Sequence, residues 1–261
     1  MNTLPQQQKF ALFNTLSVLL VLAINYYAQF YGLNGNTIAG LSDTYANLFT
    51  PAGYAFAIWG FIYVGLLVFC GAQLYQSFFL KKQDDFTLQM RGWFILTNSA
   101  NAAWIFAWLY EYTLISVLIM LVMLFALLRI VLATNMERWD APKRIIGLYW
   151  WPICFYSGWI AVATVANISA YLAKIEWDGF GISEEVWTII LIFITTLINL
   201  LIIYKRNMRE FAAVAVWALV AIFYRHQQTY ASIAMAAIFG ASVLLGYILY
   251  HGYINNKHKL R

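Results

Sequence analysis

The feature of this sequence that most constrains its fold is a series of eight apolar segments separated by short polar connections. The segments are roughly 10–30, 54–74, 93–109, 113–134, 146–172, 187–204, 211–224 and 231–250. Most reach the roughly 20 residues that a helix needs to cross a bilayer core of about 30 Å, although the third and seventh are short. Only 10% of the residues are charged, against about 25% in a soluble domain. The sequence therefore predicts an all-α integral membrane protein, a polytopic bundle of about eight transmembrane helices.

The positions of the basic residues test this topology independently, because Lys and Arg near span ends favour the cytoplasmic side. With both termini inside, fourteen of the sixteen basic residues fall on that side, and Lys174 and Arg225 fall outside. Removing one span would break this alternation. We therefore expect both termini in the cytoplasm and, because no transit peptide or cleavable signal is evident, a bacterial inner membrane. The net charge of +5 follows from this asymmetry and gives no reason to expect a nucleic-acid partner.

Charged residues are almost absent from the predicted spans. Arg129 lies toward the inner end of the fourth segment, and Glu111 lies in the turn between the third and fourth. Ion coupling through a buried carboxylate is therefore poorly supported, and no catalytic group stands out. Cys70 and Cys154 both lie in apolar segments, where a free thiol is the usual state, so we expect no disulfide framework and no metal site.

Amides and indoles enter three of the spans in stripes spaced for one helical face. The stripes are Trp59 and Tyr63 in the second segment, Asn101, Trp104 and Trp108 in the third, and Trp159, Ala163 and Asn167 in the fifth. Any one stripe alone is typical of interfacial anchoring or helix packing. Together they predict a pocket for a flat, largely apolar molecule, because indoles form a rigid apolar wall and amides orient a ligand.

The fifth segment carries the clearest of these stripes. We expect Trp159 to form a wall of the pocket and Ala163 to leave space beside it. Asn167 either donates to a ligand or ties this helix to a neighbour.

The same residues resemble the TspO/MBR family of tryptophan-rich sensory and translocator proteins. The stretch from Trp159 to Asn167 resembles its fifth-helix W-x-A-x-A-T-V-x-N signature. Asn101 to Trp104 is similar to the third-helix N-x-x-W, and Ile58 to Tyr63 is similar to the second-helix I-W-G-x-x-Y. The matches occur in the family's order. The resemblance implies a five-helix domain over residues 1–174, followed by a three-helix membrane extension over residues 175–261.

The resemblance also implies which residues bind a ligand. They are Tyr54, which stands where the family has a tryptophan, with Trp59, Tyr63, Asn101, Trp104, Trp108, Trp159, Ala163 and Asn167. The turn-rich loop from Gly32 to Pro51 contains no Lys or Arg, which places it outside. By resemblance this loop, ending at Pro51, is a lid over the pocket.

A loose cholesterol-type pattern occurs at Val165, Tyr171 and Lys174, near the position of the family's sterol motif. Leu201 and Tyr204 followed by Arg206 satisfy the same pattern elsewhere, so its specificity is low.

Three functions remain open at this stage. A membrane receptor or sensor for a porphyrin or haem-like ligand is favoured, because aromatic and amide residues are present while catalytic charges are not; no cofactor is required. A transporter of such a ligand is the second, although the sequence has neither an inverted repeat nor broken paired helices. The third is an enzyme of light-dependent porphyrin degradation, in which Trp104 and Trp159 would take part. The expected partners are the lipid bilayer, the flat ligand, and a second copy or a partner membrane protein.

Overall fold

The computed structural model describes residues 3–45 and 47–259, and this part of the chain is all-helical. The long helices are α1 (Thr3–Tyr31), α3 (Ile58–Leu74), α5 (Trp93–Leu109), α6 (Thr113–Ala133), α8 (Trp151–Lys174), α9 (Glu184–Arg206), α10 (Arg209–His226) and α11 (Ala231–Lys259). The short helices are α2 (Ile38–Thr44), α4 (Asp85–Met90) and α7 (Lys143–Ile145). Single 3-10 turns η1 (Gly53–Ala57) and η4 (Gly179–Gly181), and π-helical turns η2 (Tyr75–Phe79) and η3 (Ile146–Trp150), complete the helical elements.

Six stretches of the described chain are long and apolar enough to cross a membrane. They are Pro5–Tyr31, Gly53–Phe79, Thr113–Ala133, Lys143–Lys174, Glu184–Arg206 and Ala231–Asn255. The two predicted segments that do not join them are α5 and α10, which have 17 and 18 residues. At 1.5 Å per residue these helices are about 26 and 27 Å long. The chain is a polytopic membrane helical bundle with six candidate spans, and a count of eight stays a prediction.

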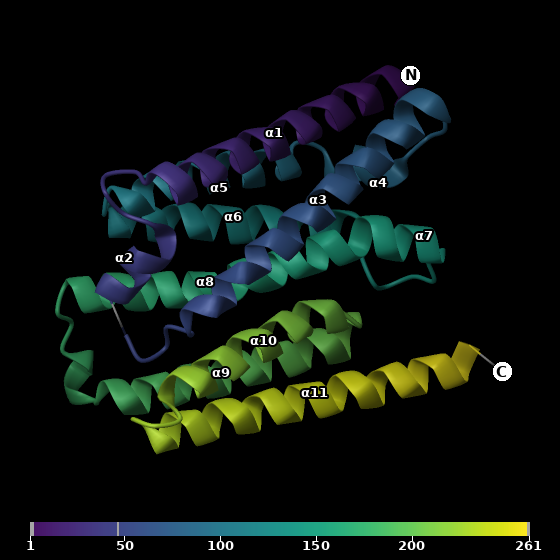
Figure 1. The fold of residues 1–261 in the computed structure, drawn as a ribbon. Coiled ribbons are helices and arrows are strands. Elements are labelled where there is room, and N and C mark those ends of the chain that lie inside the picture. The colour runs from purple at the N-terminus through teal and green to yellow at the C-terminus, as the bar shows by residue number, and fades with distance from the viewer. Residues whose placement is uncertain (1–2, 46, 260–261) are drawn as a thin grey trace.

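Both termini lie at the same end of the bundle, together with α4 and α7, whereas α2 lies at the opposite end (Figure 1). The connections beside α4 and α7 carry Lys81, Lys82, Arg91, Lys143 and Arg144. Basic loops therefore gather at the end that holds the termini, as the predicted alternation of charge requires. Which side of the membrane this end faces stays a prediction.

Helix α8 lies between two parts of the interior. A larger hydrophobic cluster is centred on α1, α3, α5, α6 and α8 and extends to Phe211, Val214 and Ala221 of α10. A smaller one joins α9, α10 and α11 to Val162 of α8 and to Phe49. The predicted domain boundary at residue 174 coincides with the last residue of α8. Whether residues 1–174 and 175–261 act as separate units stays a prediction.

The contact between α8 and α10 depends on a glycine. A Cβ built at Gly158 would lie 2.7 Å from the carbonyl oxygen of Phe211, which is closer than a side chain can approach backbone. Small residues allow close helix approach in membranes, where hiding apolar surface from lipid gives no hydrophobic gain. Gly158 therefore lets α10 pack directly on α8.

Helix α9 begins and ends with local sequence signals. Ser183 is its N-cap, with its side chain accepting from the amide of Val186. Glu184 lies in the first turn and Asn207 adopts the left-handed conformation at the C-cap, as helix ends favour. These signals fix the start of α9 at Glu184. Its contact with the amide of Leu48 shows that this start lies beside the segment that follows α2.

Candidate functional site

An aromatic pocket lies among α3, α5, α6 and α8, under the segment that contains α2. It is lined by Ile38, Ser42, Pro51, Phe56, Trp59, Trp104, Trp108, Met120, Trp159, Val162, Ala163, Ala166 and Asn167. The space among these residues totals about 550 Å³, including the part open to the exterior, but only about 40 Å³ of it admits the centre of a water-sized sphere. On that second measure one water needs about 10–15 Å³. The pocket is therefore narrow, with room for a few water molecules.

Indole and phenyl rings form its walls, some packed edge to face and some nearly parallel. Trp159 lies 6.3 Å from Trp59 at an interplanar angle of 83°, and 6.0 Å from Phe56 at 84°. Trp104 and Trp108, one turn apart on α5, are nearly parallel at 12° with centroids 6.0 Å apart. Edge-to-face and offset-parallel pairs are the preferred aromatic geometries. The walls are therefore built from rigid rings that support one another.

Asn167 links three helices at the pocket. Its Oδ1 accepts from Trp104 Nε1 at 2.8 Å, and its Nδ2 donates to Ser116 Oγ at 2.9 Å. The amide thus ties α8 to α5 and to α6. Of the two roles considered from the sequence, the structure shows this tie, while Asn167 also lines the pocket.

Trp159 differs from Trp104 in having no partner for its indole N–H. Its side chain is 2% exposed, and Nε1 has no hydrogen-bond partner among the described residues. A buried donor left unpaired costs about 1–3 kcal/mol, and most such groups in folded proteins are paired. Trp159 is therefore a lining residue of the pocket that carries a buried, unpaired hydrogen-bond donor.

We call residues 37–45 and 47–52 the lid. One part of the lid is fastened to the last turn of α5 and to the connection that follows it. Trp108 Nε1 donates to Ile38 O at 3.3 Å, and Tyr45 OH donates to Glu111 Oε2 at 2.5 Å. This second bond raises the pKa of Tyr45 to about 12 and lowers the pKa of Glu111 from its usual value. The tyrosine therefore stays neutral and the glutamate ionised around neutral pH.

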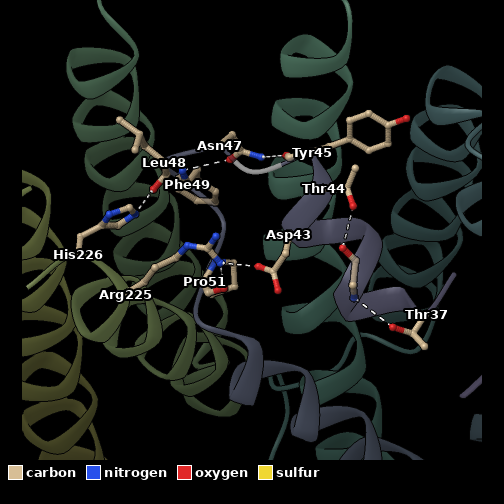
Figure 2. Close-up of polar contacts among 11 residues, drawn as sticks. Thr37, Asp43, Thr44, Tyr45, Asn47, Leu48, Phe49, Pro51, Arg225 and His226 are labelled. Carbon is tan, nitrogen blue, oxygen red and sulfur yellow. Dashed lines mark hydrogen bonds and ion pairs between the residues drawn. The ribbon is translucent and has the colours of Figure 1, made fainter. Parts of the chain in front are cut away.

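The other part of the lid is fastened to α10 and α9, as Figure 2 shows for α10. Arg225 Nη1 lies 3.0 Å from Asp43 Oδ1 and donates to Pro51 O at 3.3 Å. His226 Nε2 contacts Leu48 O at 2.9 Å. The amide of Leu48 in turn donates to Glu184 Oε1 at 2.7 Å. Helices α9 and α10 thus hold the cover of a pocket that α3, α5, α6 and α8 form.

Most of the residues predicted from the sequence to bind a ligand are brought together here. Those that line the pocket are Trp59, Trp104, Trp108, Trp159, Ala163 and Asn167, with Pro51 of the lid. The remaining three are not among the lining residues. Tyr63 stacks on Trp59 at 5.3 Å, and Asn101 Nδ2 donates to Tyr156 OH at 2.9 Å. Tyr54 is 40% exposed and its ring contacts Trp217 and Tyr224 of α10.

Several lining residues were not predicted from the sequence. They are Ile38, Ser42, Phe56, Met120, Val162 and Ala166. Phe56 lies three residues before Trp59, so the helical spacing of the second-segment stripe could have included it. Its ring contacts Trp159. Met120 and Ala166 are ordinary membrane residues, and nothing in their spacing distinguishes them from lipid-facing neighbours.

The three residues of the sterol-type pattern do not form one surface group. Val165 packs against the smaller hydrophobic cluster, and Tyr171 is half-buried. Lys174 Nζ donates to Glu111 O at 2.6 Å and lies 5.2 Å from the centre of the Tyr45 ring. Lys174 therefore belongs with the lid contacts, and sterol binding stays a prediction.

One group of metal-ligating residue types comes together near the opposite end. Glu137, Cys154 and Glu210 each offer a ligand atom, and these atoms lie within 4.8 Å of one another. The sequence analysis did not anticipate this group, because its members are distant in the chain. Three ligands are fewer than a closed structural zinc site needs, although open catalytic sites use three. The group does not line the aromatic pocket, and we assign no function to it.

A polar cavity also lies at that end, beside α4, α7 and η3. The buried acid among its lining residues is Asp84, which caps α4 and accepts from Tyr149 OH at 2.9 Å. Asp84 also accepts from Thr87 Oγ1 at 2.8 Å. The carboxylate is therefore satisfied within the protein.

The chain was compared with known protein families, curated proteins and solved structures. A family model described as TSPO-like protein matches residues 11–250. The matched stretch includes α8 and the aromatic pocket, and it continues through α9 and α10 into α11. No curated protein and no solved structure matched the chain.

Proposed function

Because the chain belongs to the TSPO-like protein family, we propose that it is a membrane receptor or sensor that binds a flat hydrophobic ligand such as a porphyrin in the aromatic pocket. Family membership indicates a membrane sensor, receptor or transporter. The observation that carries the proposal is the convergence of four indoles on one covered pocket, with the buried N–H of Trp159 unpaired among the described residues.

The chemistry of the walls favours a planar, largely apolar ligand. Trp59, Trp108 and Trp159 offer ring faces and edges, while the small side chain of Ala163 leaves space beside them. The Trp159 N–H would donate to an acceptor on the ligand, such as a propionate oxygen of a porphyrin. Sites of this kind are mostly apolar, with a few polar groups that fix orientation.

The narrowness of the pocket adds a requirement. Sites for drug-sized ligands occupy about 300–1,000 Å³, whereas the space that admits a water-sized sphere here is about 40 Å³. A porphyrin would therefore enter only if the lid moves away from α8. The lid is the element to move, because it contributes Ile38, Ser42 and Pro51 to the lining and is attached by polar contacts.

The test is a titration of the purified protein with protoporphyrin IX in the dark, following tryptophan fluorescence. We expect saturable quenching. Trp159→Phe removes the unpaired donor and keeps an aromatic wall, so the dissociation constant should rise roughly fivefold, the effect of one hydrogen bond of about 1 kcal/mol.

The matched control is Trp151→Phe, in the first turn of the same helix. Trp151 is 45% exposed and does not line the pocket, so this variant should bind as the wild type does. Quenching that never saturates, or that responds equally to both substitutions, would remove the proposal. Loss of porphyrin absorbance under illumination would move the function to light-dependent porphyrin degradation, and movement of porphyrin across sealed vesicles would move it to transport.

A further inference from the structure

On its α10 side the lid is held by two side chains that do not line the pocket, Arg225 and His226. On the α10 side, Ala52 N donates to Ala221 O at 3.2 Å, one residue after Pro51. Arg225 contacts Asp43 and Pro51 O, and His226 contacts Leu48 O, about one turn further along α10 (Figure 2). We call these four contacts the latch.

Arg225 connects the latch directly to the pocket. Its Nη1 reaches the carbonyl oxygen of Pro51, and Pro51 is a lining residue. The helix also holds the next turn of chain, since Trp217 Nε1 donates to Ala55 O at 3.1 Å, beside the lining residue Phe56. A displacement of the lid from α10 therefore displaces a wall of the pocket.

The contacts of the latch differ in their exposure to solvent. Asp43 is 60% exposed and Arg225 is 25% exposed, and ion pairs in such positions are weak and screened by salt. His226 is 4% exposed, so its hydrogen bond is protected from competing water. The histidine therefore contributes more to closure than the ion pair does.

We propose that α10 works as a latch on the lid and so sets the rate at which a ligand enters and leaves the aromatic pocket, with Arg225 and His226 as positioning residues. The ligand part rests on the proposed function; the closure of the lid by the latch does not. This assigns a role to helices that lie beyond the five-helix region.

The latch predicts a particular kinetic signature. Its four contacts join protein to protein, and neither Arg225 nor His226 is a lining residue. The lid must open both when a ligand enters and when it leaves. Breaking these contacts makes opening easier in both cases, so association and dissociation should accelerate together. Damage to the pocket would instead accelerate dissociation alone.

The first experiment needs no ligand. Hydrogen–deuterium exchange is measured by mass spectrometry on peptides covering residues 47–56, in the full chain in lipid nanodiscs. His226→Ala should accelerate exchange there about tenfold, and Arg225→Ala somewhat less, as expected for loss of a buried and of a screened interaction. His226→Gln, whose amide N–H replaces the donor, should restore slow exchange.

The control is Gln227→Ala, at the next position of the same helix end. Gln227 is exposed and its Nε2 donates only to Tyr224 O of its own helix, so the lid should exchange as in the wild type. The charge-swapped pair Asp43→Arg with Arg225→Asp should slow exchange again relative to Arg225→Ala. Unchanged exchange in His226→Ala, or acceleration spread equally over peptides of α5 and α6, would overturn the latch.

The second experiment is stopped-flow mixing of the same variants with protoporphyrin IX. Association and dissociation rates that rise together, with a nearly constant dissociation constant, support the proposal. Faster dissociation alone overturns it. If the lid exchanges faster but no variant or wild type binds protoporphyrin IX saturably, the closure by the latch stands and the ligand assignment fails.

Discussion

Helix α8 packs in different ways on its two sides, and the difference explains how a pocket persists inside a membrane bundle. Toward α3 and α5 it presents Trp159 and Asn167, whose rings and amide keep the helices apart and tied. Toward α10 it presents Gly158, where even a Cβ would collide with Phe211 O. Open space is thus made by large rigid side chains on one face, while the opposite face holds the helix by close contact.

The strongest way to break this comparison is Gly158→Ala. The new methyl group would meet backbone at 2.7 Å, and overpacking of this kind costs about 1–3 kcal/mol. We expect a lower midpoint of thermal unfolding in detergent. Gly246→Ala in α11 is the control, because nothing lies within 4 Å of a Cβ there, and the gain in helix propensity of up to about 1 kcal/mol should leave it unchanged or more stable. Equal loss of stability in the two variants would contradict the account of close packing.

A smaller effect is expected on the pocket side, from Asn167→Ala. This change removes two hydrogen bonds and leaves Trp104 Nε1 buried without its partner. We expect a loss of about 1–2 kcal/mol in stability, because interhelical hydrogen bonds in membranes are individually modest. The Trp104 indole should also shift its fluorescence emission.

Ser116→Ala provides the comparison for that measurement. It removes one of the two bonds and leaves Trp104 paired with Asn167, so its loss of stability should be about half as large. If Asn167→Ala were as stable as the wild type, the amide would not be a tie between α5, α6 and α8.

These two faces of α8 also show how much of the structure can be predicted from the sequence. The four-residue spacing of Trp159, Ala163 and Asn167 predicted one face of α8 correctly, because helical periodicity alone decides which side chains align. It did not predict that Asn167 is hydrogen-bonded to Trp104 and Ser116, because a partner on another helix depends on how the helices pack. Gly158, next to Trp159, carried no visible signal, since its importance depends on the backbone of α10.

The lid illustrates the same limit. Turn residues and the absence of basic residues placed residues 32–51 at the outer end, and the structure puts α2 opposite the termini. The attachment of the lid to Arg225 and His226 spans more than 170 residues of sequence. No local pattern marks such a contact. The third and seventh segments, short in the sequence, are the two that are absent from the six candidate spans of the described chain, because length is a local property.

The smallest expected effect concerns the exposed edge of the pocket side, where Tyr45 donates to Glu111. The pKa of Glu111 is lowered in the folded protein, so the stabilisation is present above the usual glutamate pKa and is lost as the pH falls through the lowered one. The pKa of Tyr45 is raised to about 12, so its part is lost as the pH rises through that value.

Comparison of Tyr45→Phe with the wild type across pH tests this edge. The difference in exchange at residues 36–45 should be small and constant near neutral pH, and it should vanish in acid. A difference that grows on acidification would have the wrong sign for this bond and would contradict the assignment.

The central claim, that the space between α8 and its aromatic neighbours is a ligand site, is tested most directly by filling that space. Ala163→Phe places a ring in the pocket while all four lining indoles remain, and Ala163→Ser leaves the space open. The measurement is protoporphyrin IX binding by tryptophan quenching, on protein whose folding is verified by thermal unfolding. Saturable binding that is lost in Ala163→Phe and kept in Ala163→Ser is the predicted result; a folded Ala163→Phe variant that binds with the wild-type dissociation constant would contradict it.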